Sequence, residues 1–169
     1  GVGIINMFNF MDGINGITGL YSLSTLLGLY FINVQFEIIN PELIIYLAIS
    51  ILVFGYFNFR RKALFFSGDI GSIAIGVVIF FIGLYFTVEL KSPLILLTVI
   101  VYGADSGNTL LFRKFFTDES VFDPHRHHIY QKIADVKKIS HIKISAIYTI
   151  LQTLINIIIY KGLQLNLFT

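Results

Sequence analysis

Five long stretches of almost uncharged residues dominate this chain and restrict what it can fold into. They cover residues 14–34, 43–59, 71–88, 94–112 and 142–160, and inside them the only charges are Asp105 and, at a boundary, Lys143. A helix needs about 20 mostly apolar residues to cross the hydrocarbon of a bilayer. The whole chain is 56% hydrophobic and 13% charged, with a mean hydropathy of +0.80. The sequence therefore predicts an all-α, polytopic membrane protein with about five transmembrane helices.

The connections between these stretches predict how the chain is oriented. Pro41 and Pro93 stand just before the second and fourth stretches, where proline suits the first turn of a helix. Cytoplasmic loops of membrane proteins carry an excess of Lys and Arg. Of the 12 Lys and Arg residues, all except Lys91 and Lys161 fall in or beside the 60–70 and 113–142 loops. We therefore expect these loops and the amino end in the cytoplasm, and the carboxyl end outside.

Charge and cysteine content exclude several classes of function. A formal net charge of +2 is too small to indicate a nucleic-acid partner. The chain has no cysteine, so it has no disulfides, thiolate metal sites or cysteine nucleophiles. Any chemistry is left to His, Asp, Asn and Arg. The amino end lacks Met and a basic segment and is unlike a signal peptide, so we expect this chain to begin within a longer protein.

A first polar cluster opens the first apolar stretch. Side chains three residues apart on a helix share a face, and glycines permit close backbone approach. The cluster consists of Asn6, Asn9, Asp12, Gly13, Asn15 and Gly16. Carboxylate and amide oxygens suit a hard cation such as Mg²⁺. A helix cap and turn at the membrane surface would use the same residue types, so both interpretations remain open.

A second cluster surrounds Asp69, which lies between Gly68 and Gly71 directly before the third stretch. A carboxylate there can bind a metal ion or simply favour the positive end of a helix dipole. The expected topology returns Asp69 to the membrane face that carries Asn9 and Asp12. Oxygen ligands from separate helices are therefore expected to converge on one ion, as Mg²⁺ sites with bound phosphates require.

A third cluster lies in the long loop, where His125, Arg126, His127 and His128 follow one another. We favour anion binding, because the guanidinium fork matches phosphate oxygens and imidazoles add donors. A transition-metal site lacks carboxylate partners at helical spacing, and a loop facing lipid headgroups is the remaining alternative. Asp105 is a further candidate because an ionisable residue at membrane depth is a functional hypothesis by default, although its polar neighbours in sequence could merely solvate it.

In this order the clusters resemble the polyprenyl-phosphate N-acetylhexosamine-1-phosphate transferases, the glycosyltransferase family 4 that also contains phospho-N-acetylmuramoyl-pentapeptide transferase. The resemblance extends over essentially all of the chain. It is closest to the branch that initiates O-antigen and related surface polysaccharides. The matching pieces are Asn6-x-x-Asn9-x-x-Asp12-Gly13-x-Asn15-Gly16, Phe66-x-Gly68-Asp69-x-Gly71-Ser72, Asp105 with Arg113, and His125-Arg126-x-His128-x-Tyr130-Gln131.

The resemblance implies transfer of a sugar-1-phosphate, of N-acetylhexosamine type, from a UDP-sugar to undecaprenyl phosphate with Mg²⁺ as cofactor. It implies a bacterial inner (cytoplasmic) membrane protein with a cytoplasmic active face, and a possible homodimer. Asp69 and Asn9 would hold the metal, and with Asp12 they form the expected catalytic set. The expected substrate-binding residues are Asn6, Asn15, Asp105, His125, Arg126 and His128.

Two departures from the family pattern qualify these expectations. The family also uses a paired-aspartate motif in an earlier loop, and no Asp-Asp pair occurs in this chain. Residues 1–169 therefore resemble the carboxy-terminal half of such a transferase, which we expect to need its missing amino-terminal half. Asn15 stands where many members have aspartate, which puts the nucleotide contacts in doubt. A non-catalytic membrane scaffold descended from such enzymes, or a transporter, is the alternative.

Overall fold

The computed structural model describes residues 1–116 and 127–165, which form helices and the connections between them, with no strand in these ranges. Five segments are long and apolar enough to cross a membrane, which confirms the fold class and the predicted number of spans. The bounds differ from the predicted ones by a few residues. The elements are α1 (Val2–Phe10), α2 (Ile17–Phe36), α3 (Pro41–Asn58), α4 (Gly68–Glu89), the 3-10 helix η1 (Pro93–Val99), α5 (Ile100–Phe116), α6 (Ile129–Lys137) and α7 (His141–Gln164).

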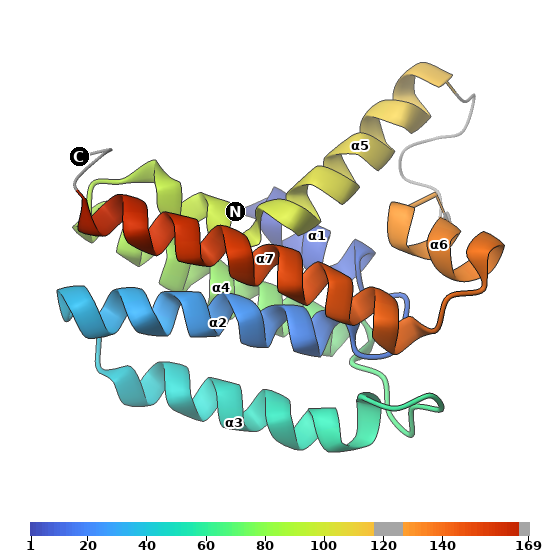
Figure 1. The fold of residues 1–169 in the computed structure, drawn as a ribbon, viewed down its shortest axis with the longest axis horizontal. Helices are drawn as coiled ribbons and strands as arrows, with labels where there is room; N and C mark the ends of the chain where they lie inside the picture. The colour runs from blue at the N-terminus through green and yellow to red at the C-terminus, as the bar shows by residue number, and fades with distance from the viewer. Residues whose placement is uncertain (117–126, 166–169) are drawn as a thin grey trace.

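The long helices lie side by side around α2 (Figure 1). α2 packs against α7, α3 and α4, and 67% of its most apolar window is buried, against 22% for α3. The turn after α1, the 59–67 loop and the connection from α6 to α7 all lie at one end of this bundle (Figure 1). The α2–α3 and α4–η1 connections lie at the opposite end. The polar clusters are therefore brought to a common end of the fold.

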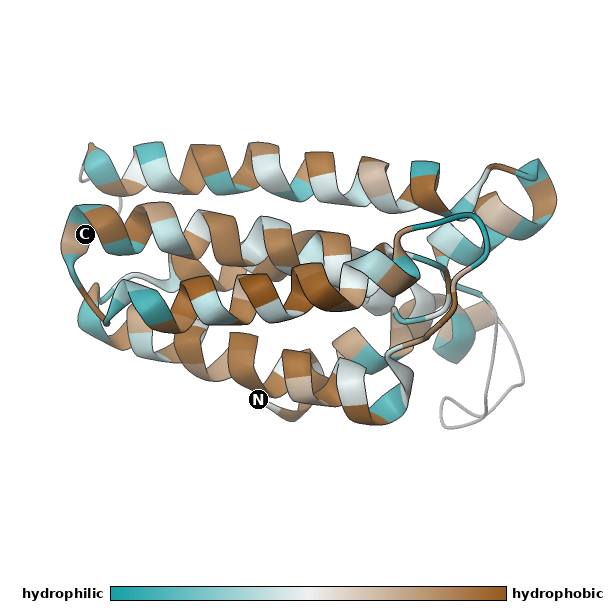
Figure 2. Ribbon diagram, turned by 90° about the horizontal axis from the view of Figure 1, so that it is seen from below, coloured by the Kyte–Doolittle hydropathy of each residue, from teal (hydrophilic) through white to brown (hydrophobic). Residues whose placement is uncertain are grey.

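The outer faces of the long helices are apolar. Brown segments recur along every long helix, with pale and teal segments between them (Figure 2). Large apolar side chains point outward, including Tyr56, Ile70 and Ile158, which are 70%, 88% and 69% exposed. Exposed apolar surface on this scale is unusual for a soluble protein and is expected where lipid is the solvent.

Asparagine side chains close the short connection between α2 and α3. The Asn33 side chain accepts hydrogen bonds from the Ile38 and Ile39 amides at 3.0 and 2.8 Å. Asn40 caps α3 by accepting from the Glu42 amide at 2.9 Å, and Pro41 occupies the first turn of the helix. The predicted helix start at Pro41 is confirmed, and Pro93 likewise begins η1.

The fourth span is broken, because η1 gives way to α5 in mid-span. Backbone groups that a change of helix type leaves unpaired must find partners inside the protein, since hydrocarbon offers none. Gln152 on α7 supplies two of them: its Nε2 donates to the Leu97 carbonyl at 3.0 Å, and its Oε1 accepts from the Val101 amide at 3.1 Å. The Tyr21 hydroxyl accepts from the Tyr102 amide at 3.2 Å and donates to Gln152 at 2.7 Å.

The same buried network continues between α2 and α7. Gln152 donates to the Asn156 side chain at 2.9 Å, and Asn156 donates to the Ser24 carbonyl at 2.9 Å. A Cβ at Gly28 would lie only 2.7 Å from the Asn156 Nδ2, so the glycine makes room for this bond. Small residues and interhelical hydrogen bonds are the usual means of joining helices in lipid.

Replacement of the central glutamine tests this account. Gln152→Leu keeps the side-chain volume but leaves buried backbone groups at the η1–α5 break without partners. We expect a loss of about 1–3 kcal/mol in unfolding free energy, measured as a lower melting temperature of the purified protein in detergent.

The matched control is Gln164→Leu, the same change near the end of the same helix, where Gln164 is exposed and bonds to Lys161 and Tyr160. This variant is expected to melt close to the wild type. Equal melting of Gln152→Leu and wild type would show that the break does not depend on Gln152.

Candidate functional site

The candidate site begins where α1 lies antiparallel against the first half of α4. A Cβ at Gly76 would be 3.0 Å from the Phe8 Cβ and 3.3 Å from the Ile5 Cα, so this glycine lets the two backbones approach closely. Phe8 is buried in this contact, whereas Asn6 on the same helix is exposed. The packing brings the end of α1 beside the start of α4.

Three oxygen-bearing residues that the sequence singles out meet at this junction. Ser72 Oγ donates to Asn9 Oδ1 at 3.0 Å and lies 3.3 Å from the backbone oxygen of Asp69. Ser67 Oγ donates to Asp12 Oδ2 at 2.5 Å. The Asp69 side chain is exposed in the first turn of α4, and Asp12 is half-buried. Asn9, Asp12 and Asp69 thus share one end of the fold, while their functional roles stay predictions.

The two carboxylates at this junction differ in their surroundings. Burial raises the pKa of Asp12 above its ordinary value of 3.8, and the negative charge of Asp69 adds to this effect. Hydrogen bonds from Ser67 and Thr18 partly oppose it; Thr18 Oγ1 lies 2.7 Å from Asp12 Oδ1. Asp12 consequently holds a proton more tightly than a free carboxyl group.

Asn15 is buried beside this junction rather than displayed on its surface. Its Nδ2 donates to the carbonyls of Arg60 and Arg61, both at 3.0 Å. Gly16, which adopts a positive φ of 82°, donates its amide to Asn58 Oδ1 at 2.7 Å. Such backbone geometry favours glycine. In this arrangement Asn15 ties the 59–67 loop to the start of α2, and the predicted nucleotide contact is untested.

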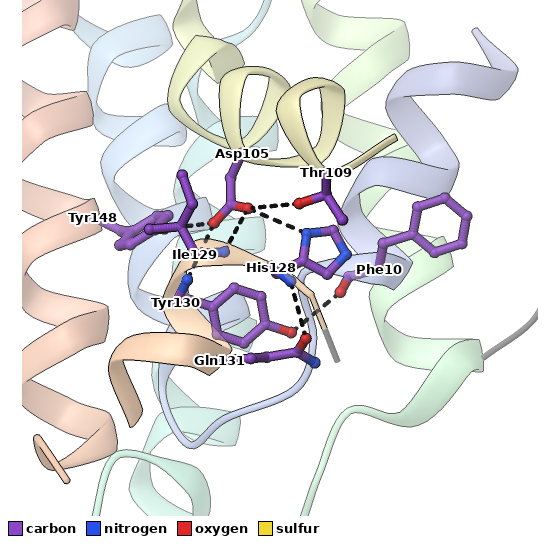
Figure 3. Close-up of polar contacts among 8 residues, drawn as sticks. All are labelled: Phe10, Asp105, Thr109, His128, Ile129, Tyr130, Gln131 and Tyr148. Atoms are coloured by element: carbon purple, nitrogen blue, oxygen red, sulfur yellow. Dashed lines mark hydrogen bonds and ion pairs between the residues drawn. The ribbon is translucent and has the colours of Figure 1, made fainter. Parts of the chain in front are cut away.

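Asp105 lies in a second polar group, formed by α5, α6 and α7 (Figure 3). It is 3% exposed. Its Oδ1 accepts from the Ile129 amide at 3.0 Å, and its Oδ2 accepts from the Tyr130 amide at 3.3 Å and the Tyr148 hydroxyl at 2.5 Å. His128 Nδ1 lies 3.2 Å and Thr109 Oγ1 3.3 Å from the same carboxylate. The structure therefore unites Asp105 with His128.

His128 is 2% exposed and is the residue before the first turn of α6. Its backbone amide donates to Gln131 Oε1 at 3.3 Å, and its ring stacks on Tyr130 at a centroid distance of 5.6 Å. The predicted phosphate contact of His128 is untested. His125 and Arg126, the other predicted members of this cluster, lie outside the described residues.

The sequence alone does not mark several residues of both polar groups as participants. Thr18, Ser67, Tyr130 and Tyr148 supply hydrogen bonds to the polar groups, yet hydroxyl residues are common and carry no signal alone. Ser67, Ser72 and Tyr130 stand inside or beside the recognised motifs, which is the only sequence signal that could have marked them. Tyr148 has no such signal, because it reaches Asp105 across 43 residues of sequence.

No group of three or more His, Asp or Glu side chains within residues 1–116 and 127–165 is arranged to hold a metal ion. Asn9, Asp12 and Asp69 offer amide and carboxylate oxygens instead. Mg²⁺ is commonly bound by one or two carboxylates, with water and substrate phosphates completing the shell. The donor set therefore fits a Mg²⁺ ion that shares its coordination with a phosphorylated substrate.

Comparisons with known proteins all indicate similarity to transferases. A family model described as glycosyl transferase family 4 matches residues 1–87, which include Asn9, Asp12 and Asp69. The chain is 26% identical over 165 residues to phospho-N-acetylmuramoyl-pentapeptide-transferase of Petrotoga mobilis (strain DSM 10674 / SJ95), covering 95% of this chain and 48% of the relative.

A second relative is the probable undecaprenyl-phosphate N-acetylglucosaminyl 1-phosphate transferase of Bacillus subtilis (strain 168). It is 27% identical over 140 residues, which are 78% of this chain and 38% of the relative. The chain thus spans less than half the length of either relative.

The raised pKa of Asp12 predicts a pH dependence of stability. Because the folded protein binds this proton more tightly than the unfolded chain, the stabilisation is complete below the ordinary carboxyl pKa and is lost as pH rises through the raised value. Asp12→Asn does not titrate. The melting temperature of wild type relative to Asp12→Asn should therefore fall as pH rises through this window and level off above it.

Asp69→Asn provides the companion measurement. Removing this negative charge lowers the pKa of Asp12. In Asp69→Asn the loss of stability with rising pH should therefore extend over a narrower pH range than in the wild type. A relative stability that rises with pH would contradict the assigned direction of the Asp12 shift.

Proposed function

Because the chain belongs to glycosyl transferase family 4, we propose that it serves in the transfer of a sugar-1-phosphate from a UDP-sugar to undecaprenyl phosphate. The sugar is of N-acetylhexosamine type, and the product initiates a lipid-linked surface glycan. The observation that carries this proposal is the meeting of Asn9, Asp12 and Asp69 at one end of a membrane bundle. There a soluble nucleotide can reach a lipid whose chain remains in the bilayer.

In this proposal the residues at the α1–α4 junction have separate roles in phosphoryl transfer. Bound Mg²⁺ would neutralise charge on the diphosphate, which is most of what such a reaction requires. Asp69, the exposed carboxylate, would be the principal metal ligand, with the Asn9 amide oxygen as a second ligand. Asp12 helps to hold the nucleotide, and Ser67 and Thr18 orient its carboxylate.

An apolar groove of about 410 Å³ between α2, α3 and α4 supports the proposal of a lipid acceptor. Leu26, Ile51 and Ile75 line it from the three helices, and it reaches Ser67, the donor to Asp12. A groove that runs from lipid-facing surface to the polar junction suits a long isoprenoid chain with a phosphate at its end. The basic residues Arg60–Lys62 follow α3 at the same end of the bundle.

The proposal also covers the membrane face on which the site lies and the part of the enzyme that this chain supplies. The gathering of basic loops at the end that carries the site supports a cytoplasmic active face in a bacterial inner membrane. The chain has no Asp-Asp pair and spans less than half of its relatives. We therefore infer that residues 1–169 act as a carboxy-terminal half and need an amino-terminal portion that carries that motif.

Asp69→Asn tests the metal assignment. Membranes that contain this chain together with the amino-terminal portion of a family relative are given UDP-[¹⁴C]N-acetylglucosamine and undecaprenyl phosphate. We expect Mg²⁺-dependent formation of labelled lipid, reduced roughly a hundredfold by Asp69→Asn because a charged ligand to the transition state is lost.

Glu89→Gln is the matched control, since it neutralises an exposed carboxylate at the other end of the same helix. It should retain wild-type turnover. Full activity of Asp69→Asn at equal expression would remove Asp69 from the metal site. No transfer by any combination would instead favour a non-catalytic membrane scaffold.

A further inference from the structure

We propose that Asp105 is a positioning residue that, through α6, holds the end of α1 and the turn after it, which carry Asn9 and Asp12. This inference rests on the proposed function for its catalytic meaning, but its structural content can be measured separately. The resemblance to known transferases implies that Asp105 contacts substrate. The geometry points to a different role, because Asp105 is enclosed by residues of its own chain.

The carboxylate of Asp105 has no capacity left for a substrate. Its two oxygens offer about four lone-pair positions. Donors from His128, Ile129, Tyr130, Tyr148 and Thr109 already lie between 2.5 and 3.3 Å from them. A side chain that is 3% exposed and surrounded in this way acts on its neighbours rather than on a bound molecule.

The first consequence of this arrangement concerns α6. The opening amides of a helix have no partner within the helix, and a nine-residue helix is marginal alone. Asp105 accepts from the Ile129 and Tyr130 amides and thereby satisfies two of the opening donors of α6. Its shortest bond, from the Tyr148 hydroxyl, joins this carboxylate to α7. Asp105 therefore fixes where α6 begins relative to two other helices.

The second consequence concerns the turn after α1. Tyr130 is fully buried, and its hydroxyl donates to the Phe10 carbonyl at 3.2 Å. A Cβ added at Gly13 would lie 2.3 Å from this hydroxyl oxygen and 3.1 Å from Gln131 Nε2. The first turn of α6 is thus packed directly against residues 10–13. Asp12 lies in this segment and Asn9 directly precedes it in the last turn of α1, so displacement of α6 would loosen the support of both.

Hydrogen exchange of the chain in lipid nanodiscs tests the connection. Asp105→Leu should accelerate exchange about tenfold or more in segments 8–16 and 128–137, because both lose their fixed contact. Asp105→Asn should rescue much of the protection, since the amide oxygen still accepts. Tyr130→Phe removes only the hydroxyl and should accelerate exchange in 8–16 while α6 stays protected.

Tyr160→Phe is the control for the tyrosine change, because the Tyr160 hydroxyl bonds to the exposed Gln164 near the far end of α7. It should leave segment 8–16 unchanged. Unchanged exchange of 8–16 in both Asp105→Leu and Tyr130→Phe would overturn the proposal. If Asp105→Leu fails to fold, Tyr130→Phe alone decides the result.

Mn²⁺ titration followed by electron paramagnetic resonance supplies a functional readout. Loss of a residue that orients metal ligands typically weakens metal affinity by about tenfold or more, and we expect that loss in Asp105→Leu with partial recovery in Asp105→Asn. Wild-type protein that binds no Mn²⁺, yet shows the coupled exchange, would overturn the proposed metal-dependent function and leave the positioning role standing. Intact Mn²⁺ affinity in a folded Asp105→Leu protein would overturn the positioning role.

Discussion

The hydrocarbon around this protein offers no hydrogen bonds, and the structure depends on how the break between η1 and α5 is accommodated in spite of this. A polar backbone group left bare in lipid costs several kcal/mol. Gln152 and Tyr21, from α7 and α2, supply the missing partners at the break. The irregular point of one span is thus covered by its two neighbours, and these three elements are joined by the same bonds.

The break also has a consequence for the position of α5. In Figure 1, α5 rises away from the other long helices, toward the end of the bundle where α6 lies. Asp105 stands near the start of this departing helix and meets α6 and α7 there. Buried hydrogen bonds therefore stabilise two parts of one span. Those at the break satisfy the backbone where the helix type changes, and those of Asp105 hold α5 against α6 and α7.

The predictable part of this fold follows from local properties of the sequence. Membrane spans are recognised from runs of apolar residues, and Pro41 and Asn40 mark a helix start by their own chemistry. The meeting of Asn9, Asp12 and Asp69 followed from counting spans. The change from η1 to α5 could not be predicted, because it depends on Gln152 more than 50 residues away. The hydrogen-bond partners of Asp105 and Asn15 could not be predicted for the same reason, since they lie on distant elements.

The shared carboxylate of Asp105 bears on how such a protein can be altered by exchange of segments. Donors from α5, α6 and α7 share the Asp105 carboxylate as acceptor, so these three helices are best exchanged together as one block. A chimera that takes α6 alone from another family member would have to bring its opening amides to the same position against Asp105. Crossover points at residues 37–40 or 90–92 would keep the block whole, because both connections precede η1 and α5 in the chain.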